Sequence, residues 1–369
     1  MKRRNFLKKT VGITGIVAAS TLSAPAISKG RIQWKMVTCW PKNFPALGTG
    51  VQRIADSIYA MSDGKFEIKV YGGGELVPAF EVFDAVREGI AEMGHDAPYY
   101  WIAKHSAMPF FTCVPGGLTA QEHAAWLYFG GGQELWDELY GQFGLKAFLA
   151  GTGGCNVGGW FRKEINSLED LKGLRMRMPG LGGEMLSRIG AIPVNLPGGE
   201  LLPALQSGAI DAVEWIAPYN DLAFGFHKIA KYYYAPGIQE PGSALGLTIN
   251  LEAYNNLTND LQNIIKYAAG DEAFRMLSEM TYGNAFSLDV LLNKHKVILK
   301  SFPQDVTDAM FDAALEILNE KSKEDDFTNK VYKSWSNYRS KVTKLASLTE
   351  MGYMNLRSNY EDKIKKIEN

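Results

Sequence analysis

The sequence contains few cysteines and no excess of charge of either sign. Its 369 residues include only Cys39, Cys113 and Cys155, which are widely spaced and form no Cys-x-x-Cys pair. The chain can therefore form at most one disulfide, and three free thiols fit the sequence equally well. Lys and Arg (39) almost balance Asp and Glu (40). This balance argues against a nucleic-acid partner recognised through phosphate contacts.

Motifs that would identify an enzyme are also missing. The five histidines are isolated in the sequence, which argues against a metal held by clustered imidazoles. The glycine triplets at 72–74 and 130–132 lack the Gly-Lys-Ser/Thr ending of a phosphate loop, so we interpret them as turns. No Gly-x-Ser-x-Gly or His-Glu-x-x-His motif is present. With 46% hydrophobic and 12% aromatic residues, the chain can bury a large core, and its length suits two lobes.

The first 28 residues have the composition of an export signal. They carry basic residues and no acidic ones, and the run Arg-Arg-Asn-Phe-Leu-Lys at 3–8 precedes an apolar stretch that ends in Ala24-Pro25-Ala26. This order predicts a twin-arginine signal peptide at 1–28 and a periplasmic location. An N-terminal membrane anchor is the alternative. The apolar stretch at 11–26 is short for a spanning helix, which needs about 20 residues.

The hydrophobic pattern after the signal is that of an α/β protein. Strands and helices alternate to about residue 235, beginning with strands at 32–39 and 66–71 and helices at 51–61 and 79–88. The segments 85–93 and 204–213 share one layout: a helix end, a glycine and a short strand. This echo favours two related lobes that face each other across a cleft, although one unit can resemble another by chance. From residue 258 the pattern is helical, at 259–293, 303–321 and 326–367.

Arg177 is the side chain whose position most favours ligand binding. In 174–178 the strand alternation places both arginines on the face opposite Leu174, Met176 and Met178. Arg177 directly precedes Met178-Pro179-Gly180 at the carboxyl end of its strand, where the ligands of open α/β sheets bind. A guanidinium group can hold a carboxylate through two parallel hydrogen bonds. A surface arginine on an edge strand is the alternative.

Several separated segments carry a resemblance to a known family. Gly-Gly-Trp-Phe-Arg-Lys-Glu-Ile at 158–165, Leu-Lys-Gly-Leu-Arg-Met-Arg-Met at 171–178, and the segments 204–215 and 232–242 resemble solute-binding proteins of tripartite ATP-independent periplasmic (TRAP) transporters. The strand, glycine turn and helix at 66–89 fit the same family. The likeness covers essentially the whole chain after the signal. It is strongest to the branch that binds 2-oxo acids such as pyruvate.

The resemblance implies a fold and its division into parts. It implies an α/β, two-lobed fold of the periplasmic-binding-protein type, with the cleft between the lobes and long bracing helices at the C-terminus. We expect the first lobe at 29–155, completed by about 243–280, and the second lobe at 156–242. The helices of 281–369 would pack across the lobes or form a homodimer interface.

The resemblance also implies a function and its residues. The protein would capture a small 2-oxo monocarboxylate, pyruvate or a longer acid, without catalysis, and deliver it to the TRAP membrane permease. Arg177 would bind the ligand carboxylate, and Tyr100 would donate a hydrogen bond from the first lobe. A metal cation that touches the ligand would be held by Asn156, Glu214, the backbone of Trp215 and Glu240. Sodium is the ion expected from the family, and calcium suits the same oxygen ligands.

Three positions depart from the pattern of the family. Asn156 stands where this branch usually has glutamine, which weakens the expected metal contact. Leu202 stands where tyrosine is common, and Trp215 where the wider family has an asparagine that touches the ligand. Trp160 and Phe161 could line the cleft, although core packing is the favoured interpretation. Other functions remain open: a binder of 2-hydroxy acids such as lactate, an exported oxidoreductase, or an assembly scaffold with an empty cleft.

Overall fold

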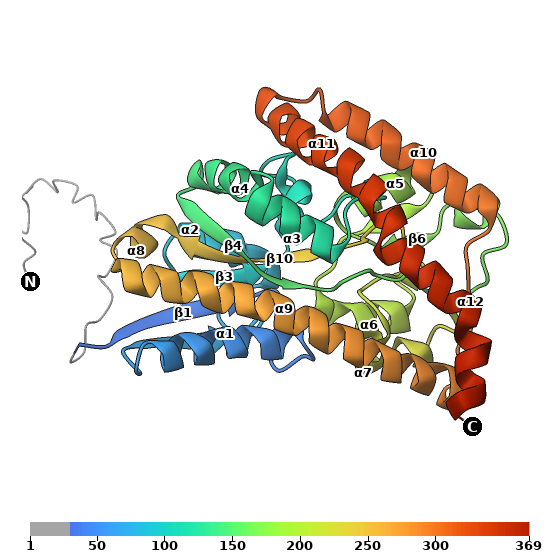
Figure 1. Cartoon of the computed structure of the whole chain (residues 1–369), viewed down its shortest axis with the longest axis horizontal. Helices are drawn as coiled ribbons and strands as arrows, with labels where there is room; N and C mark the ends of the chain where they lie inside the picture. Colours follow the sequence, from blue (N-terminus) through green and yellow to red (C-terminus); the bar gives the residue numbers. More distant parts are fainter. Residues whose placement is uncertain (1–29, 369) are drawn as a thin grey trace, which may run out of the picture.

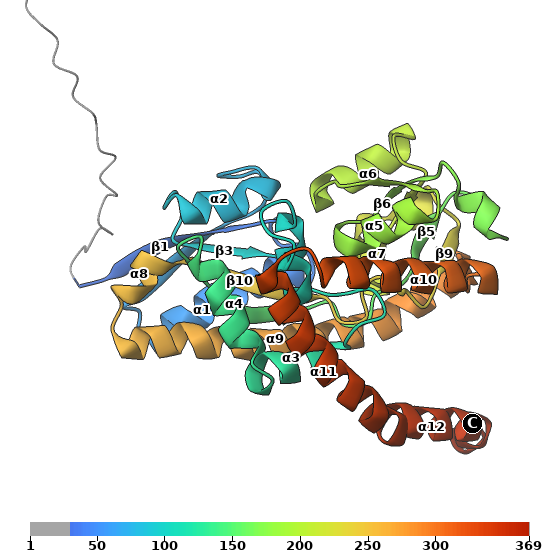
Figure 2. The same ribbon diagram turned by 90° about the horizontal axis from the view of Figure 1, so that it is seen from above.

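The computed structural model describes residues 30–368 (Figure 1). The predicted signal peptide at 1–28 lies outside these residues. The described chain forms two β-sheets, each covered by helices, which lie beside each other (Figure 2). The predicted α/β class with two lobes is therefore confirmed.

The first sheet has five strands in the order β2 (Phe66–Tyr71), β1 (Ile32–Thr38), β3 (Met93–Asp96), β10 (Ala244–Asn250) and β4 (Leu145–Thr152). β1 runs parallel to β2 and β3, whereas β10 is antiparallel to both of its neighbours. In β2 the alternation places Phe66 and Ile68 in the core and Glu67 and Lys69 in solvent, so this strand was predictable from its period of two.

Helices cover both faces of the first sheet. α1 (Leu47–Met61) contacts β2, and α2 (Val82–Arg87) follows a 3₁₀ turn and contacts β3 and β10. α3 (Ala120–Phe129) and α4 (Gly132–Gly141) pack on β4, and α8 (Leu251–Asn255) follows β10. The helices predicted at 51–61 and 79–88 are confirmed.

The second sheet is built from short strands. Its order is β11 (Ile298–Lys300), β9 (Tyr232–Tyr234), β5 (Gly159–Phe161), β8 (Ala212–Val213), β6 (Arg175–Arg177) and β7 (Ile192–Val194). The helices between these strands are α5 (Gly180–Arg188), α6 (Gly198–Ser207) and α7 (Pro218–Phe224). Between β5 and β6 the chain forms a 3₁₀ turn, Leu168–Leu171, which begins at the capping box of Ser167 and Asp170.

Two glycines explain why the segments at 85–93 and 204–213 share one layout. Gly89 and Gly208 follow α2 and α6 with φ of 74° and 76°, a left-handed conformation that favours glycine. Each glycine turns the chain from the end of a helix into a central strand, β3 in the first sheet and β8 in the second.

Long helices connect and brace the two sheets. α9 (Asn259–Asp289) contacts α1 and β4 and also α7, so it spans both lobes (Figure 1). A π-helical turn at Val290–Lys294 follows, and the chain then adds β11 to the second sheet. α10 (Gln304–Lys321) packs on α5, and α11 (Asp326–Leu348) packs on α3 and α4. α12 (Glu350–Glu368) extends from the end of α11 and stands away from the lobes (Figure 2).

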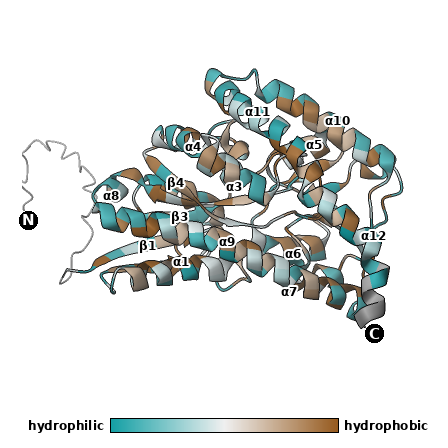
Figure 3. Cartoon of the chain, in the orientation of Figure 1, coloured by the Kyte–Doolittle hydropathy of each residue, from teal (hydrophilic) through white to brown (hydrophobic). Residues whose placement is uncertain are grey.

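Apolar residues concentrate in the strands and on the helix faces that meet them (Figure 3). Within residues 30–368, none of the helices combines the length and the apolar character needed to cross a membrane. The three cysteines are free thiols, with Cys39 and Cys113 buried and Cys155 exposed.

Candidate functional site

Arg177 ends β6 and is completely buried, at 0% exposed. Because β6 lies between β8 and β7, the alternative of a surface arginine on an edge strand is wrong. Nη1 donates to the carbonyl oxygen of Glu214 at 2.7 Å and lies 3.1 Å from its Oε2, and Nε donates to the carbonyl oxygen of Leu196 at 3.3 Å. These bonds fix the plane of the guanidinium group.

The two lobes meet at the far side of this guanidinium group. Nη2 of Arg177 lies 3.3 Å from the hydroxyl of Tyr100, which comes from the first lobe. The guanidinium carbon also lies 4.9 Å from the ring centroid of Trp215, in a cation–π contact. A guanidinium group has five N–H donors. These partners use four of them, so one Nη2 hydrogen has no partner among residues 30–368.

Asn156 lies at the centre of the residues predicted to hold a cation. Its Nδ2 is 3.1 Å from Glu214 Oε1, 3.3 Å from the carbonyl oxygen of Trp215 and 2.8 Å from Glu240 Oε2. An amide nitrogen has two hydrogens, so three acceptors converge on two donors. The amide oxygen of Asn156 accepts from Ser243 Oγ at 3.2 Å. All five residues of this cluster are at most 4% exposed.

The electrostatics of this cluster favour a positive occupant. Burial raises the pKa of Glu240 to about 7, although Arg177 and hydrogen bonds from Tyr99 and Asn156 oppose the shift. Burial and then the charge of Glu240 raise the pKa of Glu214, despite its ion pair with Arg177. Both carboxyl groups therefore hold protons more readily than exposed glutamates do.

These residues fit a hard cation. Two carboxylates and one backbone carbonyl point at the same position, and oxygen atoms are the ligands that sodium and calcium prefer. No cluster of three or more His, Cys, Asp or Glu side chains suited to a metal occurs in the part of the chain that the structure describes. A cation here would therefore depend on the amide and carbonyl groups as well as on the two glutamates.

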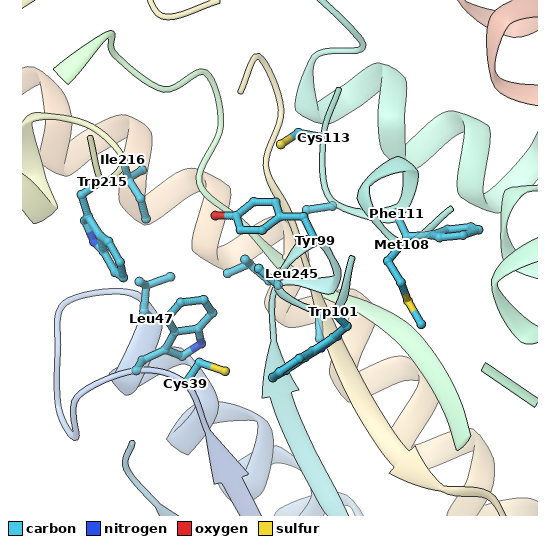
Figure 4. Close-up of a cluster of buried hydrophobic side chains, with 14 of the residues drawn as sticks. Cys39, Leu47, Tyr99, Trp101, Met108, Phe111, Cys113, Trp215, Ile216 and Leu245 are labelled. Carbon is cyan, nitrogen blue, oxygen red and sulfur yellow. The ribbon is translucent and has the colours of Figure 1, made fainter. Parts of the chain in front are cut away.

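A small cavity of about 10 Å³ remains between the lobes beside this cluster. That volume holds about one water molecule, so the two lobes lie closed on each other. Its walls are mostly apolar: Figure 4 shows Trp215 and Ile216 of the second lobe opposite Leu47 and Leu245 of the first. The other lining residues are Trp40, Tyr99, Tyr100, Glu240 and Ser243. A wider surface groove of about 640 Å³ lies between the segments 73–80 and 195–200.

The structure brings together all six residues predicted from the resemblance. Arg177 contacts both Tyr100 and Trp215, and Asn156, Glu214 and Glu240 form the adjoining polar cluster through the bonds given above. Trp160 packs in the core of the second lobe and donates to Asp221 at 2.9 Å, as favoured from the sequence. Leu202 is not among the residues that line the cavity.

Sequence reasoning missed most of the apolar wall. Trp40 lies between β1 and α1, Leu47 is the first residue of α1, and Leu245 is the second residue of β10. None of them carries a charge or lies in a motif. The only available signal was the presence of an aromatic residue, Trp40, directly after a strand end, where ligands often bind.

Comparisons with known proteins agree with this site. The family of bacterial extracellular solute-binding proteins, family 7 (DctP), matches residues 36–325. A monocarboxylate 2-oxoacid-binding periplasmic protein of Nostoc sp. is 39% identical over 365 residues, which cover 97% of this chain and 99% of the relative.

Solved structures of TRAP periplasmic solute-binding proteins are similar as well. One from Pseudoalteromonas atlantica, with bound sodium and pyruvate, has a TM-score of 0.86 and 41% identity, and the match covers 88% of this chain and 99% of that one. One from Colwellia psychrerythraea, with calcium and pyruvate, has a TM-score of 0.85, 40% identity and the same coverage. A third, from Bordetella bronchiseptica, is a mixed-occupancy dimer with calcium and picolinate (TM-score 0.89, 34% identity, covering 90% and 99%).

These matches extend over almost the whole described chain and agree with its two-lobed fold. Proteins of this family bind solutes for transport in the periplasm and hand them to a membrane permease; they are not enzymes. The chain belongs to bacterial extracellular solute-binding protein family 7 and is the solute-binding protein of a TRAP transporter.

Proposed function

We propose that this protein captures a small 2-oxo monocarboxylate, pyruvate or a slightly longer acid, together with a metal cation. The observation that carries the proposal is the convergence of Glu214 Oε1, the Trp215 carbonyl and Glu240 Oε2 on one point beside Arg177. The relatives that bind pyruvate with sodium or calcium support it. The ligand would not be chemically changed, because the family consists of solute-binding proteins for transport.

Arg177 would bind the ligand carboxylate. One hydrogen of its Nη2 is directed to the Tyr100 hydroxyl, and the second hydrogen of the same nitrogen would bind the carboxylate. Burial raises the pKa of Tyr100, so the hydroxyl keeps its proton. That hydroxyl can accept from Arg177 and donate to the carboxylate. One residue from each lobe would then hold the same ligand group.

The cation would balance the charge of the closed site. Glu214, Glu240 and the ligand carboxylate carry three negative charges against the one positive charge of Arg177. Uncompensated charges cost several kcal/mol each in a buried site. A cation bound to the two carboxylates, the Trp215 carbonyl and the ligand would offset most of that cost. Sodium and calcium both suit this set of oxygen atoms.

Asn156 would change its orientation when the cation binds. Its Nδ2 occupies the centre of the three oxygen atoms, while its oxygen accepts from Ser243. A half-turn of the amide would present the oxygen to the cation and the nitrogen to Ser243 Oγ, which can also accept. This short amide could therefore serve in both states, although the branch usually has glutamine at this position.

The proposal is tested by titrating the metal-free protein with pyruvate, longer 2-oxo acids and lactate, with and without sodium or calcium. Tryptophan fluorescence reports occupancy, because Trp40 and Trp215 both line the cavity. Saturable quenching that needs a cation and is strongest for 2-oxo acids is the expected result. Preference for lactate would favour the 2-hydroxy acid alternative. Absence of binding by any acid would contradict the proposal, and a coloured bound cofactor would favour an oxidoreductase.

We also propose the division of the chain given from its sequence, and export of the precursor by the twin-arginine route. The first sheet uses strands between 32 and 152 plus β10, which supports a first lobe at 29–155 completed by 243–280. Export is tested by following the precursor in cells in which twin-arginine transport is blocked. Accumulation of uncleaved precursor is expected, and normal maturation would contradict it.

We further propose that the C-terminal helices form a homodimer interface. Leu348, Met351 and Leu356 are 82%, 51% and 60% exposed on the end of α11 and on α12, and α12 has no lobe beside it in Figure 2. α9 exposes the aromatic pair Tyr282 and Phe286. The dimeric relative supports a second copy as the occupant. Light scattering should give a dimer that Leu348→Glu with Leu356→Glu converts to a monomer; a monomeric wild type would contradict the proposal.

A further inference from the structure

His95 is hydrogen-bonded to the wall of the cavity, although no motif or resemblance points to it. It lies in β3 and is 0% exposed. Its Nδ1 is 2.8 Å from Trp40 Nε1, and its Nε2 is 3.1 Å from the carbonyl oxygen of Ala150. An indole N–H can only donate, so Nδ1 accepts. The proton therefore sits on Nε2, which donates to Ala150.

The carbonyl of Ala150 is available because of an irregularity in the sheet. Gly246 of β10 pairs with Leu149 of β4, whereas Leu245 pairs with Gly151. This shift leaves Ala150 without a partner in the register. Such bulges redirect backbone groups and are common beside functional sites. Here the bulge supplies a fixed acceptor for His95.

Trp40 lies where the lobes meet. Its ring centroid is 6.0 Å from that of Trp215, with the planes at 78°, and 6.2 Å from that of Tyr100. All three rings line the cavity. Trp215 in turn carries the guanidinium group of Arg177 on its face. A continuous set of contacts therefore leads from His95 through Trp40 and Trp215 to Arg177.

His95 is suited to accept the hydrogen bond from the indole of Trp40 at all times. Burial lowers its pKa to about 4, so Nδ1 stays an acceptor at the pH of the periplasm. The backbone carbonyl of His95 also accepts from Cys39 N at 3.1 Å and from Thr38 Oγ1 at 3.0 Å. Side chain and backbone thus fix both the indole and the chain segment that carries it.

We propose that His95 is a positioning residue that holds the indole of Trp40 against Trp215 and so fixes the apolar wall of the ligand cavity. This inference rests on the proposed function for the identity of the ligand. His95 does not itself line the cavity, so it acts through Trp40. Its loss should weaken ligand binding and leave the cation ligands in place.

The test compares four variants of the purified protein. His95→Leu keeps a side chain of similar size and removes both hydrogen bonds. His95→Gln can still accept from Trp40 and donate to Ala150. Trp40→Phe removes the N–H donor. Trp34→Phe is the matched control, because Trp34 is also a buried tryptophan of the first lobe, but its Nε1 has no partner and it packs on Phe66 away from the cavity.

Two readouts are measured: pyruvate affinity at saturating calcium, and the indole N–H resonance of Trp40 in the ligand-free protein. His95→Leu and Trp40→Phe should each weaken pyruvate binding about tenfold. His95→Leu should also move the Trp40 indole resonance, and His95→Gln should restore both readouts to near wild type. Trp34→Phe should leave pyruvate affinity within about twofold of wild type. Calcium affinity without pyruvate should be unchanged in all four.

Several results would overturn the inference. Wild-type pyruvate affinity and an unmoved indole resonance in His95→Leu would do so, as would an equal loss of affinity in Trp40→Phe and Trp34→Phe. If His95→Leu does not fold, the inference is judged from the pyruvate affinities of Trp40→Phe and Trp34→Phe. It is upheld if only Trp40→Phe loses affinity. If the wild type binds no pyruvate with any cation, the proposed function fails. The Trp40 indole resonance in His95→Gln and His95→Leu then tests on its own whether His95 positions Trp40.

Discussion

Replacement of Arg177 by alanine should abolish most ligand binding. The side chain is fully buried and makes four hydrogen bonds, one of them between Nη2 and the hydroxyl of Tyr100 from the other lobe, which leaves the second Nη2 hydrogen for the ligand. Truncation of one partner in a buried, hydrogen-bonded charge pair costs about 2–5 kcal/mol. We therefore expect pyruvate affinity to fall by a factor of roughly 30 to several thousand.

Arg177→Lys separates charge from geometry. Lysine keeps the positive charge but lacks the planar fork, so it cannot reach Leu196, Glu214 and Tyr100 together as the guanidinium group does. Its affinity for pyruvate should lie between that of wild type and that of Arg177→Ala.

Arg175→Ala is the matched control for the alanine variant. Arg175 lies on the same strand, two residues earlier, and pairs with Asp211 at 2.8 Å near the surface. Calorimetric titration with pyruvate at saturating calcium is the assay. Affinity of Arg177→Ala within about threefold of wild type, or an equal loss in Arg175→Ala, would refute the assignment of Arg177 as the carboxylate-binding residue.

Four further predictions concern the cation and the contact between the lobes. Glu240→Gln removes a carboxylate from the cluster and should lower calcium affinity at least about tenfold in calorimetry; unchanged affinity would exclude Glu240 as a ligand. Because the pKa of Glu240 is raised to about 7 without metal, calcium must displace a proton, so its affinity should fall and proton release should rise as the pH is lowered from 8 to 5.5. Because the pKa of Glu240 is higher in the folded than in the unfolded chain, the metal-free protein loses stability as pH rises from about 4.5 through 7. Calcium should therefore raise the melting temperature more at pH 8 than at pH 5.5. An increase in melting temperature that does not depend on pH would contradict this. Tyr100→Phe removes the hydroxyl 3.3 Å from Arg177 Nη2 and should weaken pyruvate binding about five- to tenfold while leaving calcium affinity unchanged; wild-type pyruvate affinity would count against a ligand contact from the first lobe.

Hydrophobic periodicity was sufficient to predict the strands and helices in which apolar residues recur regularly. β2 alternates over six residues, and α9 follows the helical spacing predicted for 259–293. The position of β10 could not be predicted in the same way, because it pairs with β3 and β4 about 100–150 residues earlier. β8, with two residues, is too short for any periodicity to show.

Part of the candidate site could be predicted from the sequence in the same way, and part could not. Alternation and the strand end pointed to Arg177, and the resemblance to a family pointed to the carboxylates and to Asn156. The apolar wall was not accessible to either argument. Trp40 and His95 are joined by a side-chain hydrogen bond across 55 residues of sequence, and neither lies in a recognisable motif. Contacts of this kind depend on how β1 and β3 pair, which only the folded chain reveals.

The dependence of pyruvate affinity on cation concentration tests the central claim most directly. If one cation bridges Glu214, Glu240 and the ligand, binding of cation and ligand must be coupled, and each must strengthen the other by the same factor. Calorimetric titrations of the metal-free protein with pyruvate over a series of sodium or calcium concentrations should therefore show affinity that rises until the cation site is full. Titrations with the cation over a series of pyruvate concentrations should give the same coupling factor. Pyruvate affinity that does not change with either cation would contradict a shared site for ligand and metal.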